Sequence, residues 1–148
     1  MDGILLVDVV LDPLGSLMSV VRRLASVAVG SHGMIHILGF VVAWKLATIH
    51  TMSYSTSLLG GSVDVGAGGI RATGVVWLLL AVSFVVGAVE IWRRASWAPQ
   101  LIGVTASVSA VACLLAISTA SAGLVIDLGI LAWLWFSRAR LGQVHPAR

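Results

Sequence analysis

The sequence predicts an all-α polytopic membrane protein: an antiparallel bundle of four transmembrane helices with both chain ends in the cytoplasm. Three observations predict this fold: long apolar stretches, few charged residues, and arginines gathered at one side of the stretches. Of the 148 residues, 59% are hydrophobic and 10% are charged, and the mean hydropathy is +1.05. Ordinary soluble domains carry about 25% charged residues, so a soluble domain is excluded. Barrel strands would alternate with period two, which these stretches do not do, so they are expected to be helices.

Four stretches are long enough to cross a bilayer, because a span needs about 20 apolar residues to cover ~30 Å of hydrocarbon. We expect the spans at residues 24–49, 74–92, 98–119 and 122–136. The short 119–122 connection predicts that the last two spans form an antiparallel hairpin. The Gly-rich connection 51–73 is expected to be an extracytoplasmic loop, and it lacks the ending of a phosphate-binding loop. Residues 22–138 thus form one membrane domain, followed by a basic cytoplasmic tail, 139–148.

The orientation follows from the positive charges. With a cytoplasmic N-terminus, most of the nine Lys and Arg residues lie inside, which is the arrangement that the positive-inside rule favours. Tryptophans flank the same spans: Trp92 and Trp97 bracket the cytoplasmic turn, and Trp77 opens the second span at the opposite boundary, where indole rings prefer to lie. The expected cytoplasmic residues are Arg22, Arg23, Arg93, Arg94, Arg138, Arg140 and Arg148.

The N-terminal segment, 1–21, is expected to be cytoplasmic or interfacial. It carries three aspartates and no basic residue, so it is not a secretory signal. Asp12 and Pro13 have the character of a helix cap and first helical residue, which predicts a helix running along the cytoplasmic face into the first span. The alternative is that translation starts at Met18, which places a basic N-terminus directly before the span.

Histidines and small residues share one face of the first span. His32, His36 and His50 fall within about 40° of one another on a helical wheel. Small residues allow a neighbouring helix to approach closely, and histidines in spans usually face the bundle interior. We therefore expect His32 and His36 to hydrogen-bond across the bundle to backbone or Ser groups. The small residues of this face are Gly39, Ala43 and Ala47, and the available serines are Ser83, Ser107 and Ser109.

The spacing of the histidines limits what they can bind. His32 and His36 lie about 6 Å apart along the helix axis and can share one metal ion, whereas His50 lies about 21 Å beyond His36. Two histidines leave a metal short of ligands, and neither Glu90 nor Asp127 is expected at the depth of His36. The sequence therefore assigns no metal site and leaves any cofactor, haem included, unknown. The one cysteine, Cys113, is expected to be an apolar packing residue.

Asp127 is a carboxylate inside an apolar span, which is costly unless it is paired, protonated or hydrated. We expect it about 8 Å inside the outer boundary of the fourth span, at a depth similar to Lys45. An interhelical pair between Lys45 and Asp127 would neutralise both charges. The alternative is that Lys45 extends outward to the headgroups and Asp127 stays protonated. Glu90 is expected to pair with Arg93 or Arg94 at the interface.

Three function classes remain open. The first is a non-enzymatic accessory or scaffold subunit of a membrane complex. The second is binding or transport of a small lipophilic or ionic ligand in a cavity lined by His32, His36, Asp127 and Lys45. The third is a redox subunit in which His32 and His36 hold a cofactor. No Ser-His-Asp set, nucleophile elbow or HExxH motif is present, so no catalytic residues are assigned. Expected partners are the bilayer and other membrane subunits or a second copy, but not nucleic acid.

A resemblance adds to these expectations. The segment 22–44 contains RRL, then HGMIHILGF and a tryptophan, and resembles the first span of small bacterial four-helix membrane proteins whose opening reads HGxxHxxGF. Residues 74–81, GVVWLLLA, resemble their second span, and the composition is similar to that of high-GC actinobacteria. These proteins share a general likeness with the DoxX-like group. The resemblance implies a multi-pass protein of the bacterial inner membrane and a partner of quinone-linked redox enzymes.

Overall fold

The computed structural model is all-helical apart from one small hairpin. It describes the backbone of residues 3–50 and 52–143 and the side chains of 15–50 and 52–138, so the chain end at 144–148, with Arg148, lies outside it. The helices are α1 (Gly3–Ala43), α2 (Gly66–Arg93), α3 (Ala98–Leu115) and α4 (Ile117–Gln143). Between α1 and α2 lie β1 (Ser57–Leu58), a 3-10 turn η1 (Leu59–Gly61) and β2 (Val63–Asp64). The predicted all-α class is confirmed.

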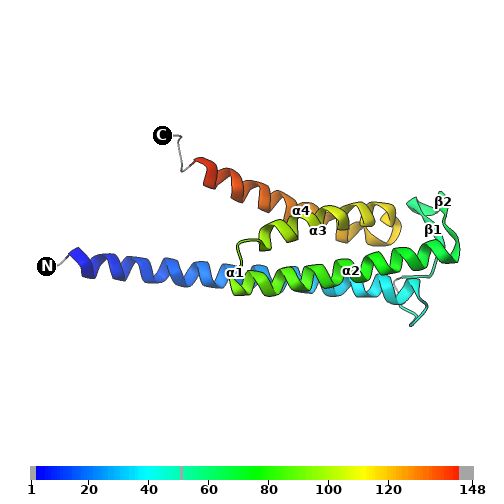
Figure 1. Ribbon diagram of the computed structural model, residues 1–148, viewed down its shortest axis with the longest axis horizontal. Helices are drawn as coiled ribbons and strands as arrows, with labels where there is room; N and C mark the ends of the chain where they lie inside the picture. Colours follow the sequence, from blue (N-terminus) through cyan, green and yellow to red (C-terminus); the bar gives the residue numbers. More distant parts are fainter. Residues whose placement is uncertain (1–2, 51, 144–148) are drawn as a thin grey trace.

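All four helices are long and apolar enough to cross a membrane, which is consistent with an integral, multi-pass membrane protein. α1 packs along α2, α2 contacts α3, and α3 packs against α4. Figure 1 shows that α1 extends well beyond the end of α2, while the β1–β2 hairpin lies at the opposite end of the molecule. The span-length part of α1 is Gly15–Ala43.

The ends of α1 differ from those expected. α1 begins at Gly3 and is continuous through Pro13, whereas the sequence predicted a helix starting near Pro13; the side chain of Asp12 lies outside the described ones. α1 ends at Ala43 and not at residue 49, because Lys45 adopts a left-handed backbone with φ 55°. Ala47 and His50 therefore lie beyond the helix, and they do not continue the face formed by His32 and His36.

α2 begins at Gly66, eight residues before the expected start of the second span, so part of the Gly-rich connection is helical. Packing explains this outcome: a Cβ on Gly74 would lie 2.7 Å from the Cβ of Ala43, so this turn of α2 is held against the end of α1. Just before the helix, Asp64 accepts a hydrogen bond from the backbone N–H of Gly66 at 2.9 Å. This bond, followed by one from Thr56, lowers the pKa of Asp64.

α4 begins at Ile117, directly after α3, with a non-helical residue at Ala120 (φ −118°, ψ 17°). The fourth span was expected to begin at residue 122. Because Ala120 interrupts the helix, the regular helix that carries Asp127 runs from residue 121, about 9 Å before Asp127 and close to the expected 8 Å. The misplaced residue is Lys45, because α1 ends before it.

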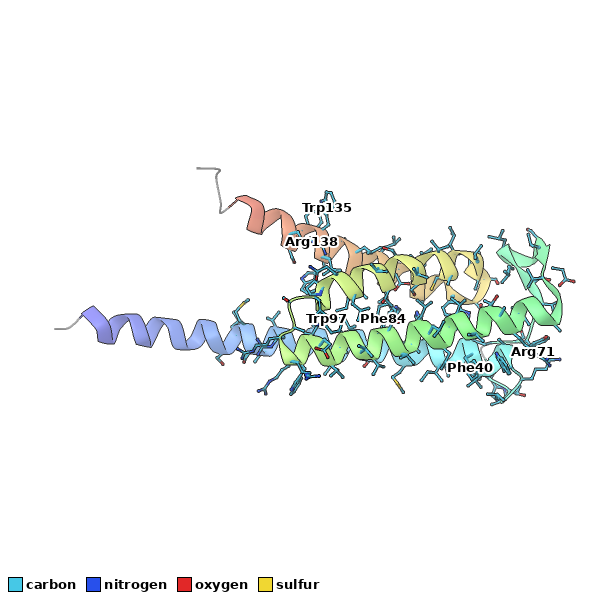
Figure 2. The ribbon with its side chains drawn as sticks, viewed as in Figure 1. Phe40, Arg71, Phe84, Trp97, Trp135 and Arg138 are labelled. Atoms are coloured by element: carbon cyan, nitrogen blue, oxygen red, sulfur yellow. The ribbon has the colours of Figure 1, made fainter. Side chains whose placement is uncertain are left out.

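Side chains mark the two ends of the helical body. Trp97 and Arg138 lie toward one end and Phe40 and Arg71 toward the other (Figure 2). At the first end, the guanidinium of Arg23 lies over the Trp92 ring, 5.5 Å from its centroid. The predicted Glu90 interaction is confirmed nearby, where Arg93 Nη1 lies 3.3 Å from the carboxylate of Glu90.

Glycines allow α1 and α2 to approach closely. A Cβ at Gly33 would lie 2.7 Å from the Cβ of Phe84 and 3.1 Å from the carbonyl oxygen of Ala81. A Cβ at Gly39 would lie 2.8 Å from Cγ of Trp77. The hydroxyl of Ser26 adds an interhelical hydrogen bond, donating to the carbonyl of Ala88 at 2.7 Å. Gly39 thus allows the close helix contact that the sequence predicted for this face.

The Gly33→Ala variant should destabilise the protein, because the new methyl group meets Phe84 Cβ and the α2 backbone, which cannot move independently. We expect a loss of about 1–3 kcal/mol in the free energy of unfolding, measured by thermal or denaturant unfolding in detergent. Gly129→Ala is the matched control, since nothing lies within 4 Å of a Cβ there. It should leave stability unchanged or raise it by up to about 1 kcal/mol. Equal effects of the two substitutions would contradict the close contact.

Candidate functional site

A cluster of buried polar side chains joins three of the helices. α1 contributes His32 and His36, α3 contributes Ser109 and Cys113, and α4 contributes Asp127. All are at most 3% exposed, and Ser109 and Asp127 are completely buried. Polar groups buried this deeply in an apolar helical assembly are costly unless they satisfy one another, so their mutual contacts determine what the cluster can do.

The hydrogen bonds of the cluster converge on the carboxylate of Asp127. His32 Nε2 lies 2.8 Å from Oδ1, and the Ser109 hydroxyl donates to Oδ2 at 2.6 Å. Because the hydroxyl proton of Ser109 goes to Asp127, the 2.7 Å contact between His36 Nε2 and Ser109 Oγ has the histidine N–H as donor. The thiol of Cys113 also donates to Oδ2, at 3.6 Å. The donors therefore gather around one acceptor, as they would around a negative charge.

One polar atom of the cluster is left without a partner. His32 Nδ1 is buried and has no hydrogen-bond partner among the described residues. A buried ring nitrogen that loses its water without replacement costs about 1–3 kcal/mol. The protein side chains alone therefore do not complete the bonding of His32.

α2 holds the histidine rings in place with aromatic side chains. The His32 and His36 rings meet edge to face, with centroids 4.7 Å apart. Phe84 packs against both rings, 4.9 Å from His32 and 5.4 Å from His36, and Trp77 packs against His36 at 5.2 Å. Trp77, which was expected to open the second span, lies eleven residues into α2 and is only 8% exposed, because α2 starts at Gly66.

A cavity of about 420 Å³ reaches the cluster. Its walls come from the last turns of α1, the first turns of α2, the α3–α4 turn, and the 52–61 connection. His36, Trp77 and Cys113 belong to its lining, so the cavity ends on the buried polar groups. The 52–61 connection contributes hydroxyl side chains, including Ser53, Tyr54 and Ser55, on the other side.

The structure brings together three of the four residues predicted to line a ligand site. Ligand atoms of His32, His36 and Asp127 all lie within 4.8 Å of one another. Lys45 is not with them: its ammonium group lies 4.1 Å from the centroid of the Tyr54 ring. The expected Lys45–Asp127 pair is wrong, because α1 ends before Lys45, and Asp127 pairs with His32 instead. Whether these residues bind a ligand stays a prediction.

The histidine expectations hold in part. His36 bonds to Ser109, as predicted, whereas His32 bonds to a carboxylate that the sequence placed at another depth. Cys113 is more than an apolar packing residue, since it donates to Asp127. Ser109 and Cys113 are four residues apart and therefore share one face of α3. The sequence alone does not distinguish Ser109 from the other serines that could bond to the histidines.

No protein-family model, curated protein or solved structure matches this chain. The resemblance to small DoxX-like membrane proteins accordingly stays a prediction that rests on the sequence motif.

Asp127→Ala should cost roughly 3–5 kcal/mol of stability, because it leaves His32 and Ser109 without their buried acceptor. Since His32 and Asp127 share one bond, the double variant with His32→Ala should lose less than the sum of the single losses, by about 0.5–3 kcal/mol. Denaturant unfolding in detergent measures the stability loss of the two single variants and of the double variant. Glu90→Ala is the carboxylate control, where the partner Arg93 is 70% exposed, and should cost at most about 1 kcal/mol. Strict additivity of the His32 and Asp127 losses would argue against the bond.

Proposed function

We propose that this chain is an integral membrane protein that binds a small lipophilic ligand in the cavity beside the polar cluster. The observation that supports this proposal is the cavity of about 420 Å³, whose lining includes His36 and Cys113. Small-molecule sites in proteins are typically about 300–1,000 Å³, mostly apolar, with a few polar groups that orient the ligand. This cavity has that composition.

The lining suggests the chemical class of the ligand. Aliphatic and aromatic side chains, among them Ile35, Val42 and Trp77, form much of the wall, and hydroxyl groups of the 52–61 connection lie at the other side. A molecule with an apolar body and a polar group that hydrogen-bonds near His36 fits these walls. A quinone has this chemistry, which links the proposal to the quinone-linked role that the sequence resemblance implies.

We propose further that the four helices cross the inner membrane of a bacterium as an antiparallel bundle, with both chain ends in the cytoplasm. Arg23 and Trp92 lie together at one end, where Arg93 is the last residue of α2, and Arg138 lies toward that end too (Figure 2), which supports a cytoplasmic side there. The cavity lies toward the opposite end, beside the 52–61 connection, so its ligand would enter from the extracytoplasmic side or from the outer leaflet.

An accessory role in a larger membrane complex is the second candidate. The observation that favours it is the small burial of α4: 11% of the residues in its apolar 18-residue stretch are buried, against 28–39% in the corresponding stretches of the other helices. In the membrane, a partner subunit or a second copy of the chain could cover the exposed surface of α4 in place of lipid. Purification of the tagged protein from its native membrane tests this role, with a stable partner at fixed stoichiometry as the expected result. A lone, monomeric chain would count against it.

Ligand binding in the cavity can be tested with decylubiquinone as probe on the purified chain in detergent. Native mass spectrometry should detect one probe per chain, and Ala116→Phe, which places a large ring in the cavity lining, should weaken binding by at least about tenfold. Val111→Phe on the preceding helix α3 is the control, because that side chain is 59% exposed, and should bind as the unchanged protein does. Thermal unfolding verifies that both variants are folded. Equal binding by folded Ala116→Phe would exclude this cavity as the site.

A further inference from the structure

We propose that His32, His36 and Asp127 bind a divalent transition-metal ion, for which zinc has the best matching ligand preferences. The three residues offer two imidazole nitrogens and a carboxylate oxygen within 4.8 Å of one another, and each residue is at most 3% exposed. They come from α1 and α4, two helices far apart in the sequence. This inference goes beyond the lipophilic ligand proposed above and does not depend on it.

The distances are close to those of a metal site. Zinc binds histidine nitrogen and carboxylate oxygen at about 2.0–2.2 Å in a tetrahedral arrangement, which places neighbouring ligand atoms about 3.3–3.6 Å apart. His32 Nε2 and Asp127 Oδ1 are 2.8 Å apart, a hydrogen-bond distance that has to lengthen by about 0.5 Å. The largest separation, 4.8 Å, therefore has to shorten by about 1.5 Å, which side-chain rotation can achieve without moving the helices.

Cys113 supplies a fourth donor. Its sulfur lies 3.6 Å from Asp127 Oδ2, a spacing that fits two ligands of one ion. When the ion binds, the thiol proton leaves to solvent through the cavity, and the thiolate, the carboxylate and two neutral imidazoles surround a doubly charged ion. The site is then electrically neutral, which matters because an uncompensated charge in the interior of a membrane protein is expensive.

The two nitrogens of His32 determine where the ion would bind. A metal-binding histidine usually coordinates through one nitrogen and donates the other N–H to a carboxylate or carbonyl. His32 has one nitrogen on Asp127 and the other, Nδ1, without a partner. Asp127 lies on the Nε2 side of the ring, so an ion that both residues bind has to replace the hydrogen bond at Nε2, and Nδ1 then carries the N–H of the neutral ring.

The cavity gives the ion a path. Two of the four donors, His36 and Cys113, line it, so an ion can reach the cluster without passing through the packed aromatic contacts of Phe84.

The test is a metal titration of the full chain, purified in detergent and stripped with a chelator. Co²⁺ serves as the probe because tetrahedral Co²⁺ absorbs visible light, and Zn²⁺ should displace it. We expect one ion per chain. His36→Gln and Asp127→Asn should each weaken binding by at least about tenfold, whereas His50→Gln, at an exposed histidine outside the cluster, should bind normally. Cys113→Ser should remove the sulfur-to-cobalt charge-transfer band.

A folded chain that binds no Co²⁺ or Zn²⁺ saturably would overturn the proposal, and so would equal loss of binding in His50→Gln and His36→Gln. Should the cluster variants fail to fold, X-ray absorption at the zinc edge of the unchanged protein decides: two imidazoles per zinc are expected, and a shell of oxygen alone would overturn the site. Because metal titration needs no lipophilic ligand, it can succeed where decylubiquinone binding fails, and the reverse also holds.

Discussion

The arrangement of the helices depends on the need to satisfy one buried carboxylate. Asp127 has no exposed surface in an assembly whose outer face is apolar, and an isolated charge there would cost several kcal/mol. Donors from α1 and α3 converge on it. The main packing partner of α1 is α2, and that of α4 is α3. The His32–Asp127 bond therefore connects two helix pairs across the centre of the molecule, and it links the positions of the helices to the geometry of the site.

The glycines of α1 explain why the histidines reach that carboxylate. Gly33 lies against Phe84 and the backbone of α2, and Gly39 lies against the Trp77 ring, so that the rings of Phe84 and Trp77 pack edge-on against His32 and His36. This close approach uses one side of α1 for α2 and leaves Nε2 of His32 facing α4 and Nε2 of His36 facing α3. The glycines and histidines of the first span therefore act together. The small residues set the distance between α1 and α2, and this packing orients the histidine rings toward α3 and α4.

Much of the fold could be predicted from hydropathy, because the length and apolar character of a span are local properties of the sequence. The helix ends could not, since the left-handed residue Lys45 and the non-helical Ala120 depend on packing between turns. The errors in the helix ends led to wrong predictions of which site residues meet. His32, His36 and Asp127 were each identified as unusual, but extending the first span to residue 49 placed Lys45 inside it, at the depth of Asp127. Choosing Ser109 among several serines requires the register between helices, which one sequence does not contain.

The cavity and the cluster share His36, and this sharing constrains any function that uses both. His36 lines the cavity with one part of its ring and donates to Ser109 with Nε2. An ion on His36 would occupy a nitrogen that a ligand in the cavity would otherwise approach, so the two occupants compete unless the ligand itself binds the ion. Competition of this kind is reciprocal: whatever weakening the ion causes in ligand affinity, the ligand causes in ion affinity. If the molecule in the cavity carries an oxygen that coordinates the ion, each occupant strengthens the binding of the other, because that oxygen becomes a ligand of the ion.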